Sequence, residues 1–248
     1  MKLKDKVAVV TGGGRGIGRA IATAYAQEGA LVIVTAAREK TEIDEVASRI
    51  GGKAILADVT NRDDVRMLVD RVLTESGQID ILVNNAGRGM KYVNQEFMTV
   101  PRPFWEADPD AWQMVIRTNV GGVFEMSRAV VPHMLERGYG RIINISMNLE
   151  TMKRKGFTPY GPSKAALESM SMIWAQELEG SGVTLNVLLP GGATLTGMIP
   201  ASLSQRQRSQ LLDPSVMGPP AVFLASDEAK ECNGQRIVAI EWNKEHLE

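Results

Sequence analysis

A tyrosine and a lysine four positions apart, Tyr160 and Lys164, are the residues of this sequence best suited to chemistry. Side chains four residues apart lie on one face of an α-helix. Pro162 between them fits a helix only within its first turn, where a missing N–H costs little. A phenol near a helix N-terminus and beside an ammonium group should lose its proton more readily than a free tyrosine, whose pKa is about 10. The pair predicts proton transfer to or from an oxygen atom, although the same spacing also arises by chance.

A glycine-rich turn near the N-terminus is the second feature with chemical meaning. Residues 11–18 read Thr-Gly-Gly-Gly-Arg-Gly-Ile-Gly, directly after an apolar run and before a helical pattern. Glycines allow the backbone to approach a pyrophosphate, and the helix N-terminus offers free N–H groups and the positive end of its dipole. Such turns also merely connect strands to helices, but this context favours a dinucleotide site. Its candidate residues are Gly12, Gly14, Arg15, Gly16, Ile17 and Gly18.

The elements that must position these residues follow from the hydrophobic pattern. Seven short, continuously apolar runs are typical of strands covered on both faces, at Val7–Thr11, Leu31–Thr35, Ala54–Ala57, Ile79–Val83, Arg141–Ile145, Thr184–Leu189 and Arg236–Ile240. Helical patterns lie between them, near 16–28, 40–50, 62–76, 109–137, 160–179 and 214–226. This alternation predicts an α/β fold, a doubly wound sheet of seven parallel strands with helices on both faces. Without a linker or repeat, residues 1–248 are expected to form a single domain.

Two long connections interrupt this alternation, at residues 88–108 and 191–213. Both follow the carboxyl ends of expected strands, where open parallel sheets bind ligands. Long loops in compact α/β domains are usually functional, so we expect a substrate wall or lid rather than an inert surface insertion.

Further motifs follow the expected strands in order. They are Asp58-Val59 after the third strand, Asn84-Asn85-Ala86-Gly87 after the fourth, Asn119 in the next helix, Tyr160-Gly161-Pro162-Ser163-Lys164, and Pro190-Gly191 after the sixth strand. Three residues rather than one separate Gly12 from Gly16. With these motifs, nearly the whole sequence resembles the classical short-chain dehydrogenase/reductase family. Each match alone is modest, and their order carries the resemblance.

The resemblance implies a Rossmann-type, NAD(P)-dependent oxidoreductase that interconverts a ketone or aldehyde and an alcohol by hydride transfer. It implies that Tyr160 is the acid/base and that Lys164 also holds the nicotinamide ribose. An oxidised nicotinamide beside the phenol would further favour the loss of its proton. Asn119 would help to hold a proton-relay water, unless it is only a helix-bending polar residue. The cofactor would also contact Asp58, Val59, Asn85, Ala86, Gly87, Pro190 and Gly191. The family further implies a homotetramer or homodimer, assembled through the long helices near 109–137 and 160–179.

One position departs from the family pattern. The family's catalytic serine normally stands thirteen residues before the tyrosine, and here that position is Met147. A thioether cannot donate a hydrogen bond to a substrate oxygen. Ser146 and Asn148 flank it, and the Asn148 amide would be a reasonable donor if the end of the strand brings it inward. The alternative is a weakly active or regulatory homologue that binds the dinucleotide without efficient chemistry.

Cofactor choice depends on the end of the second strand, Thr35-Ala36-Ala37-Arg38. NAD users generally place an acid there for the ribose 2′-hydroxyl, and neither 36 nor 37 is acidic. Arg15 and Arg38 would suit a 2′-phosphate, unless both are solvated surface arginines. NADP(H) is therefore favoured, with NAD(H) as the alternative.

Two groups of residues near the expected substrate entrance have open interpretations. Lys153-Arg154-Lys155 either attracts an anionic substrate or is a solvated charge run, which is the commoner case. A set of aromatic and methionine side chains either lines an apolar pocket or belongs to core and lid packing; it comprises Phe97, Met98, Phe104, Trp105, Met152, Phe157 and Met198.

Composition excludes several other classes of protein. Lys and Arg number 28 and Asp and Glu 29, for a net charge of −1, so no attraction to nucleic acid or anionic membranes is expected. The single cysteine, Cys232, allows no internal disulfide and suits a reducing compartment. The two histidines lack neighbouring ligands, so no metal site is expected. The first apolar run is too short for a signal peptide or a membrane span, which predicts a soluble cytoplasmic protein.

Overall fold

Seven parallel strands form the central sheet of the computed structural model, in the order β3-β2-β1-β4-β5-β6-β7. The structure describes residues 1–200 and 202–247, so position 201 of the expected loop 191–213 and position 248 of the expected domain lie outside the described residues. The strands are β1 Val7–Thr11, β2 Leu31–Ala36, β3 Lys53–Leu56, β4 Ile81–Asn84, β5 Gly140–Ile145, β6 Val183–Leu189 and β7 Arg236–Val238. The predicted fold class, a doubly wound parallel sheet, is confirmed.

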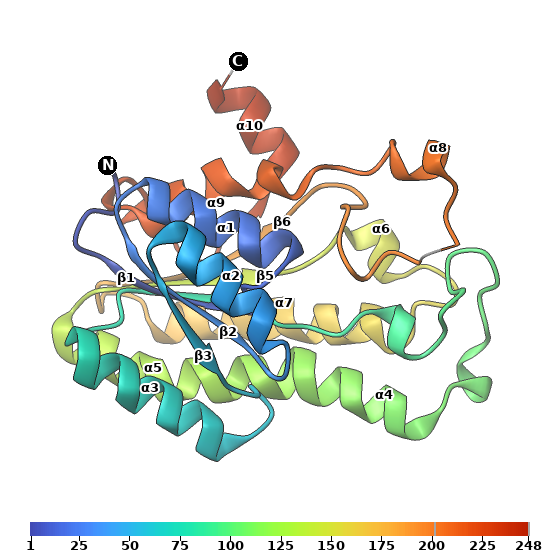
Figure 1. Cartoon of the computed structure of the whole chain (residues 1–248), viewed down its shortest axis with the longest axis horizontal. Helices are drawn as coiled ribbons and strands as arrows, with labels where there is room; N and C mark the ends of the chain where they lie inside the picture. Colours follow the sequence, from blue (N-terminus) through green and yellow to red (C-terminus); the bar gives the residue numbers. More distant parts are fainter. Residues whose placement is uncertain (201, 248) are drawn as a thin grey trace.

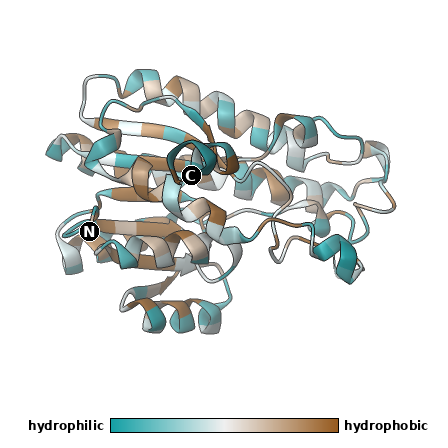
Figure 2. Ribbon diagram, turned by 90° about the horizontal axis from the view of Figure 1, so that it is seen from above, coloured by the Kyte–Doolittle hydropathy of each residue, from teal (hydrophilic) through white to brown (hydrophobic). Residues whose placement is uncertain are grey.

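Helices cover both faces of the sheet, which explains why the strands are continuously apolar. One core cluster joins the sheet to α1, α2 and α9, and a second joins its other face to α3, α5 and α7 (Figure 1). Figure 2 shows the apolar strands between helices whose outer faces are hydrophilic. The helices are α1 Gly16–Gln27, α2 Lys40–Ile50, α3 Arg62–Ser76, α4 Pro109–Ile116, α5 Gly122–Arg137, α6 Leu149–Met152, α7 Tyr160–Glu177, α8 Gln205–Arg208, α9 Gly218–Ala225 and α10 Ala239–Leu247.

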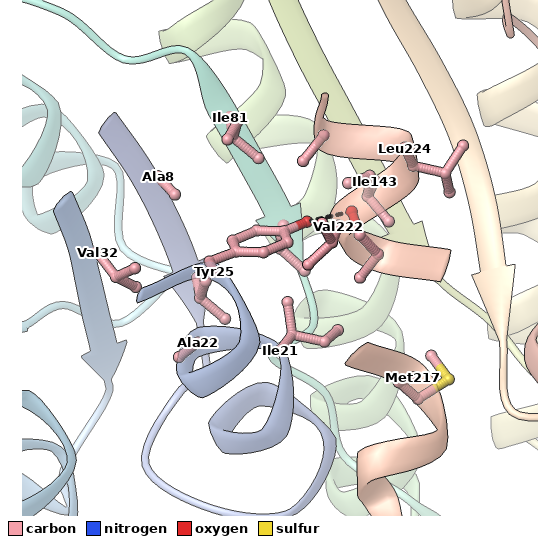
Figure 3. Packing of buried hydrophobic residues seen from close by; sticks show 14 of the residues in the cluster. Ala8, Ile21, Ala22, Tyr25, Val32, Ile81, Ile143, Met217, Val222 and Leu224 are labelled. Carbon is pink, nitrogen blue, oxygen red and sulfur yellow. Dashed lines mark hydrogen bonds between the residues drawn. The ribbon is translucent and has the colours of Figure 1, made fainter. Parts of the chain in front are cut away.

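Tyr25 illustrates how the first core cluster is held together (Figure 3). Its ring is fully buried between α1, the sheet and α9, and its hydroxyl donates a hydrogen bond to the Ala221 carbonyl at 3.1 Å. Burying a hydroxyl without a hydrogen-bond partner would destabilise the fold, and the bond to Ala221 offsets this desolvation cost. The contact joins the first helix to α9, about two hundred residues later in the chain.

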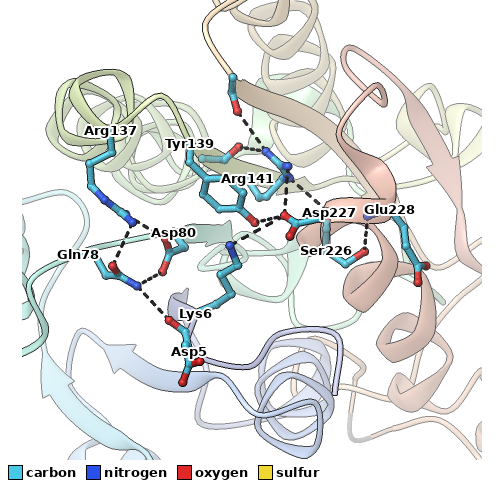
Figure 4. A network of polar contacts seen from close by, with 12 residues as sticks. Asp5, Lys6, Gln78, Asp80, Arg137, Tyr139, Arg141, Ser226, Asp227 and Glu228 are labelled. Atoms are coloured by element: carbon cyan, nitrogen blue, oxygen red, sulfur yellow. Dashed lines mark hydrogen bonds and ion pairs between the residues drawn. The ribbon is translucent and has the colours of Figure 1, made fainter.

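A polar network occupies the edge of the sheet where strands begin (Figure 4). Asp80 is almost fully buried and accepts hydrogen bonds from Val7 N at 2.7 Å, Gln78 Nε2 at 2.8 Å and Arg137 Nη1 at 2.9 Å. The carboxylate is thereby paired and hydrogen-bonded, as a buried charge must be. This network ties β1, β4 and α5 together at the edge opposite the one where parallel sheets bind ligands.

Besides shifts of one or two residues at strand ends, three elements differ from the sequence-based expectation. The last strand ends at Val238, because its partner β6 ends at Leu189, and α10 begins where residues 239–240 were expected to be strand. The helical pattern near 109–137 is divided by a π-helical turn, Arg117–Gly121. The pattern near 214–226 begins with a 3₁₀ turn, Pro214–Met217.

Candidate active site

A cleft of about 540 Å³ opens at the carboxyl ends of the strands and reaches the switch between β1 and β4. Both predicted loops contribute to its walls, through residues 88–98 and 192–199. Most of the predicted site residues line it: Gly12, Gly14, Arg15, Gly16, Ile17, Arg38, Asp58, Val59, Asn85, Ala86, Gly87, Asn148, Tyr160, Lys164 and Pro190. Residues from across the chain, expected from separate motifs, thus share one cavity.

The glycine turn forms one end of this cleft. Gly12 and Gly16 have φ angles of +64° and +53°, which residues with a side chain rarely adopt. The Thr11 hydroxyl accepts hydrogen bonds from Asn85 N and Ala86 N, both at 3.0 Å, and so holds the two motifs together. The bare backbone and the free N–H groups at the start of α1 fit a pyrophosphate.

Charged side chains gather at the end of β2. The Arg15 guanidinium pairs with Glu42 at 3.1 Å and with Glu39 at 4.0 Å, and all three side chains are substantially exposed. Arg38 is exposed and lines the cleft, and the positions before it are Ala36 and Ala37. The two glutamates are cleft residues that sequence reasoning missed; their place at the start of the helix after the second strand was the available signal.

Tyr160 and Lys164 lie in the first two turns of α7, as predicted from Pro162. Lys164 is buried, and its Nζ donates a hydrogen bond to the Ile145 carbonyl, at the end of β5, at 2.6 Å. Burial lowers the pKa of Lys164 to about 8, and the nearby Glu168 carboxylate acts in the opposite direction. The ammonium is therefore held at the cleft by the neighbouring strand.

The lowering of the Tyr160 pKa was expected with an oxidised nicotinamide beside the phenol, and for that complex it stays a prediction. Tyr160 is half-buried against an apolar cluster that includes Met147 and Phe157, and burial raises its pKa to about 12. Burial raises the pKa because an apolar environment solvates the charged phenolate poorly. The phenol is consequently protonated at neutral pH and can donate a proton.

Asn119 lies in the π-helical turn, fully buried. Its amide donates hydrogen bonds to the Arg88 carbonyl at 3.0 Å and to Ser163 Oγ at 2.9 Å, and its oxygen accepts from Arg88 N at 2.8 Å. The side chain therefore joins the chain after β4 to the first turn of α7 from behind the cleft wall. Single π-helical turns are frequent at functional sites.

Met147 is buried in an apolar cluster with Met90, Phe97, Met152 and Phe157. The two neighbours that could replace its missing hydrogen bond both have partners. Ser146 Oγ donates to Glu168 Oε1 at 2.6 Å, and Asn148 Nδ2 donates to the Gly191 carbonyl at 3.0 Å. An amide carries two hydrogens, so Asn148 retains a second N–H.

Three of the predicted catalytic and cofactor-binding residues do not line the cleft. Asn119 lies behind its wall. A Cβ on Gly18 would come within 2.3 Å of the Gly12 carbonyl, so this glycine is required for packing the helix onto the turn. Gly191, with φ of +95°, packs against Ile240 and accepts the Asn148 hydrogen bond. Thr194 does line the cleft and was missed; its position shortly after the β6 motif was the signal.

Comparison with known proteins agrees with this geometry. The sequence model of the family described as short chain dehydrogenase matches residues 6–207. The chain belongs to the short-chain dehydrogenase/reductase family. It is 33% identical to the 3-oxoacyl-(acyl-carrier-protein) reductase FabG of Thermotoga maritima over 96% of this chain and 97% of that protein. It is 35% identical to the reductases of the same name from Vibrio harveyi and Escherichia coli, over 96% of each chain.

As a family member, the protein is a short-chain NAD(P)-dependent oxidoreductase that acts on CH–OH and carbonyl groups. NADP(H) is the favoured cofactor, and the end of β2 carries no acid at positions 36 and 37. Within residues 1–200 and 202–247, no helix has the length and apolarity to cross a membrane, and no cluster of three or more His, Cys, Asp or Glu is placed to hold a metal ion.

Proposed function

We propose that the protein catalyses the reversible reduction of a ketone or aldehyde to an alcohol, with Tyr160 as the acid/base. The observation that carries this proposal is the single cleft that contains both the glycine turn and the Tyr160–Lys164 pair. A dinucleotide laid along it from Arg38 to Tyr160 would have its pyrophosphate at Gly12–Gly16 and its reactive end beside the phenol. The nicotinamide would supply or accept the hydride.

The protein's own residues supply the proton chemistry. In the direction of reduction, Tyr160 Oη donates its proton to the substrate oxygen, which is compatible with the raised pKa of the phenol. The resulting phenolate would be stabilised by the nearby Lys164 ammonium, which Ile145 holds in place. Lys164 would also hold the nicotinamide ribose, and Asn119 would fix the chain around the first turn of α7.

Asn148 is the proposed replacement for the missing serine. Its side chain lines the cleft, and its second amide hydrogen is available to a substrate oxygen. Loops 88–108 and 191–213 would form the substrate walls. The relatives named above are reductases of 3-oxoacyl groups held by an acyl carrier protein, so 3-oxoacyl thioesters are the first substrates to test.

The expectation of a cytoplasmic protein stays a prediction.

The change Tyr160→Phe tests this proposal. It removes only the hydroxyl, so we expect turnover of a 3-oxoacyl thioester to fall by about 10²–10⁴ while NADPH binding stays within twofold. Turnover is measured by NADPH oxidation, and binding by fluorescence titration. Near wild-type turnover in the variant would show that Tyr160 is not the acid/base.

Met147 favours a second candidate function, a dinucleotide-binding protein with little or no catalysis. The apolar surroundings of Met147 and the partners of Ser146 and Asn148 support it. This candidate predicts tight NADPH binding without turnover on any carbonyl compound, with Tyr160→Phe then having no measurable effect.

A further inference from the structure

The two ends of the cleft differ in chemistry. The carboxylates that line it, among the described residues, are Glu39, Glu42 and Asp58, all at the end that follows β2 and β3. Around Tyr160 the lining is apolar and rich in sulfur, with Met90, Met98, Met147, Met198, Phe97 and Phe157. Flexible thioethers adapt to varied apolar shapes, so this end suits an apolar group.

Two arginines stand at this apolar end. The Arg154 guanidinium lies over the Phe157 ring, 5.5 Å from its centroid, and Phe157 in turn makes an edge-to-face contact with Phe97 at 5.4 Å. The Arg88 guanidinium lies over the Tyr92 ring at 4.8 Å. All five residues line the cleft. Stacking on an aromatic face restricts a guanidinium while leaving its N–H groups free for an anion.

The charges of both arginines are unpaired among the described residues. In the part of the chain that the structure describes, Arg88 and Arg154 form no ion pair, whereas Arg15 at the other end pairs with two glutamates. The main chain of Arg88 is fixed by two hydrogen bonds to Asn119, so its side chain starts from a defined position. The adjacent Lys153 and Lys155 do not line the cleft, so of the three-residue basic run only Arg154 faces the site.

We infer that the substrate is an apolar carbonyl compound that carries an anionic group, and that Arg88 and Arg154 bind this group at the mouth of the apolar end. A carboxylate and a phosphate share the required chemistry, since both accept paired hydrogen bonds from a guanidinium. The inference rests on the proposed function, because it names the substrate class of the same site. It explains why two arginines without an ion pair, in addition to Lys164, line the end of the cleft where the described residues include no acid.

Binding of simple probes to the NADP⁺ complex tests the inference without any turnover. The probes are decanoate, decyl phosphate and decan-1-ol, below their aggregation concentrations, with binding measured by calorimetry. We expect either or both anions to bind at least tenfold more tightly than the alcohol. Arg154→Gln and Arg88→Gln should each remove about tenfold of that affinity and leave decan-1-ol binding within twofold, because only the charge-assisted contact is lost.

Lys153→Gln is the matched control. It removes the same charge one residue away but not from the cleft lining, so anion affinity should stay within twofold. The inference is overturned if decan-1-ol binds as tightly as both anions, or if Lys153→Gln weakens the anions as much as Arg154→Gln does. If one arginine variant binds the anions as tightly as the wild type, that arginine does not bind the anionic group. Failure of the proposed function would be seen separately, as turnover that survives Tyr160→Phe.

Discussion

Met147 lies where a hydrogen-bond donor is expected, thirteen residues before Tyr160. If Asn148 has taken over this role, Asn148→Ala should lower turnover by about 10²–10³, the usual effect of losing one oxyanion donor, and Met147→Ser should change it little. Steady-state kinetics with NADPH would measure both. Leu149→Ala, an exposed neighbour, is the control and should leave turnover unchanged. A large gain in Met147→Ser with no loss in Asn148→Ala would mean that nothing has replaced the serine.

The arginines at the end of β2 allow a prediction about cofactor preference. Arg15→Ala together with Arg38→Ala should weaken NADPH binding at least tenfold and hardly change NADH, because only NADPH has the 2′-phosphate. The structure adds a reverse test. Glu42→Gln removes the carboxylate 3.1 Å from Arg15, so NADPH should bind more tightly. Fluorescence titration with both cofactors measures these changes, and tighter binding of NADH than NADPH by the wild type would contradict the assignment.

At the scale of elements, α7 is linked to two strands close to Tyr160 and Lys164. Glu168, one turn after Lys164, accepts a hydrogen bond from Ser146 and pairs with Arg236 of β7 at 3.0 Å. Arg236 also donates to the Met147 carbonyl at 3.0 Å. The contacts of Glu168 and Arg236 therefore link β7 and the end of β5 to the helical turn that follows Lys164. The sequence contained the spacing of Lys164 and Glu168 but nothing that indicated Arg236.

This tie predicts a change in pH dependence. Glu168 raises the pKa of Lys164, so Glu168→Gln should move that pKa below its value of about 8. Lysine is charged below its pKa, so the variant should lose the ammonium at lower pH than the wild type. The alkaline limb of NADPH binding and of kcat/KM should therefore shift to lower pH, as pH profiles would show. Glu177→Gln, on the exposed surface of the same helix, should leave the profile unchanged.

At the scale of the whole molecule, the amino and carboxyl ends of the strands carry different groups of residues. The edge where strands begin carries the buried Asp80 network, and the edge where strands end carries the cleft. One sheet spans residues 7–238, and a single domain over the whole chain stays a prediction. Helices α5 and α7 cover the same face of the sheet (Figure 1).

These two helices lead to a prediction about assembly. Phe124 of α5 and Met172 and Ile173 of α7 are exposed apolar side chains, and Phe124 contacts Trp174 at 6.3 Å between ring centroids. Pairing with a second copy would remove this apolar surface from water. Met172→Glu should therefore reduce the oligomer to a smaller species in light scattering after size exclusion. Met67→Glu, an exposed methionine on α3, should not. A wild-type monomer would contradict the predicted homodimer or homotetramer.

The sequence alone determined the fold class and most of the motif residues that meet in the cleft. Apolar runs of strand length between amphipathic helical patterns leave a covered parallel sheet as the natural solution, and motifs at strand ends must then gather at one edge. Pro162 located the start of α7, because proline is tolerated only in the first turn. The glycine turn was recognisable because its backbone conformation is nearly exclusive to glycine.

Only the tertiary structure decided the electrostatics and the hydrogen-bond partners. The Tyr160 pKa depends on what buries the phenol, and that cluster comes from residues 90–157, scattered along the chain. Glu42 beside Arg15, Arg236 beside Glu168 and Gly191 beside Asn148 are contacts between elements, which no local pattern encodes. The end of β7 was likewise decided by its partner strand, because a strand continues only as long as a neighbour pairs with it.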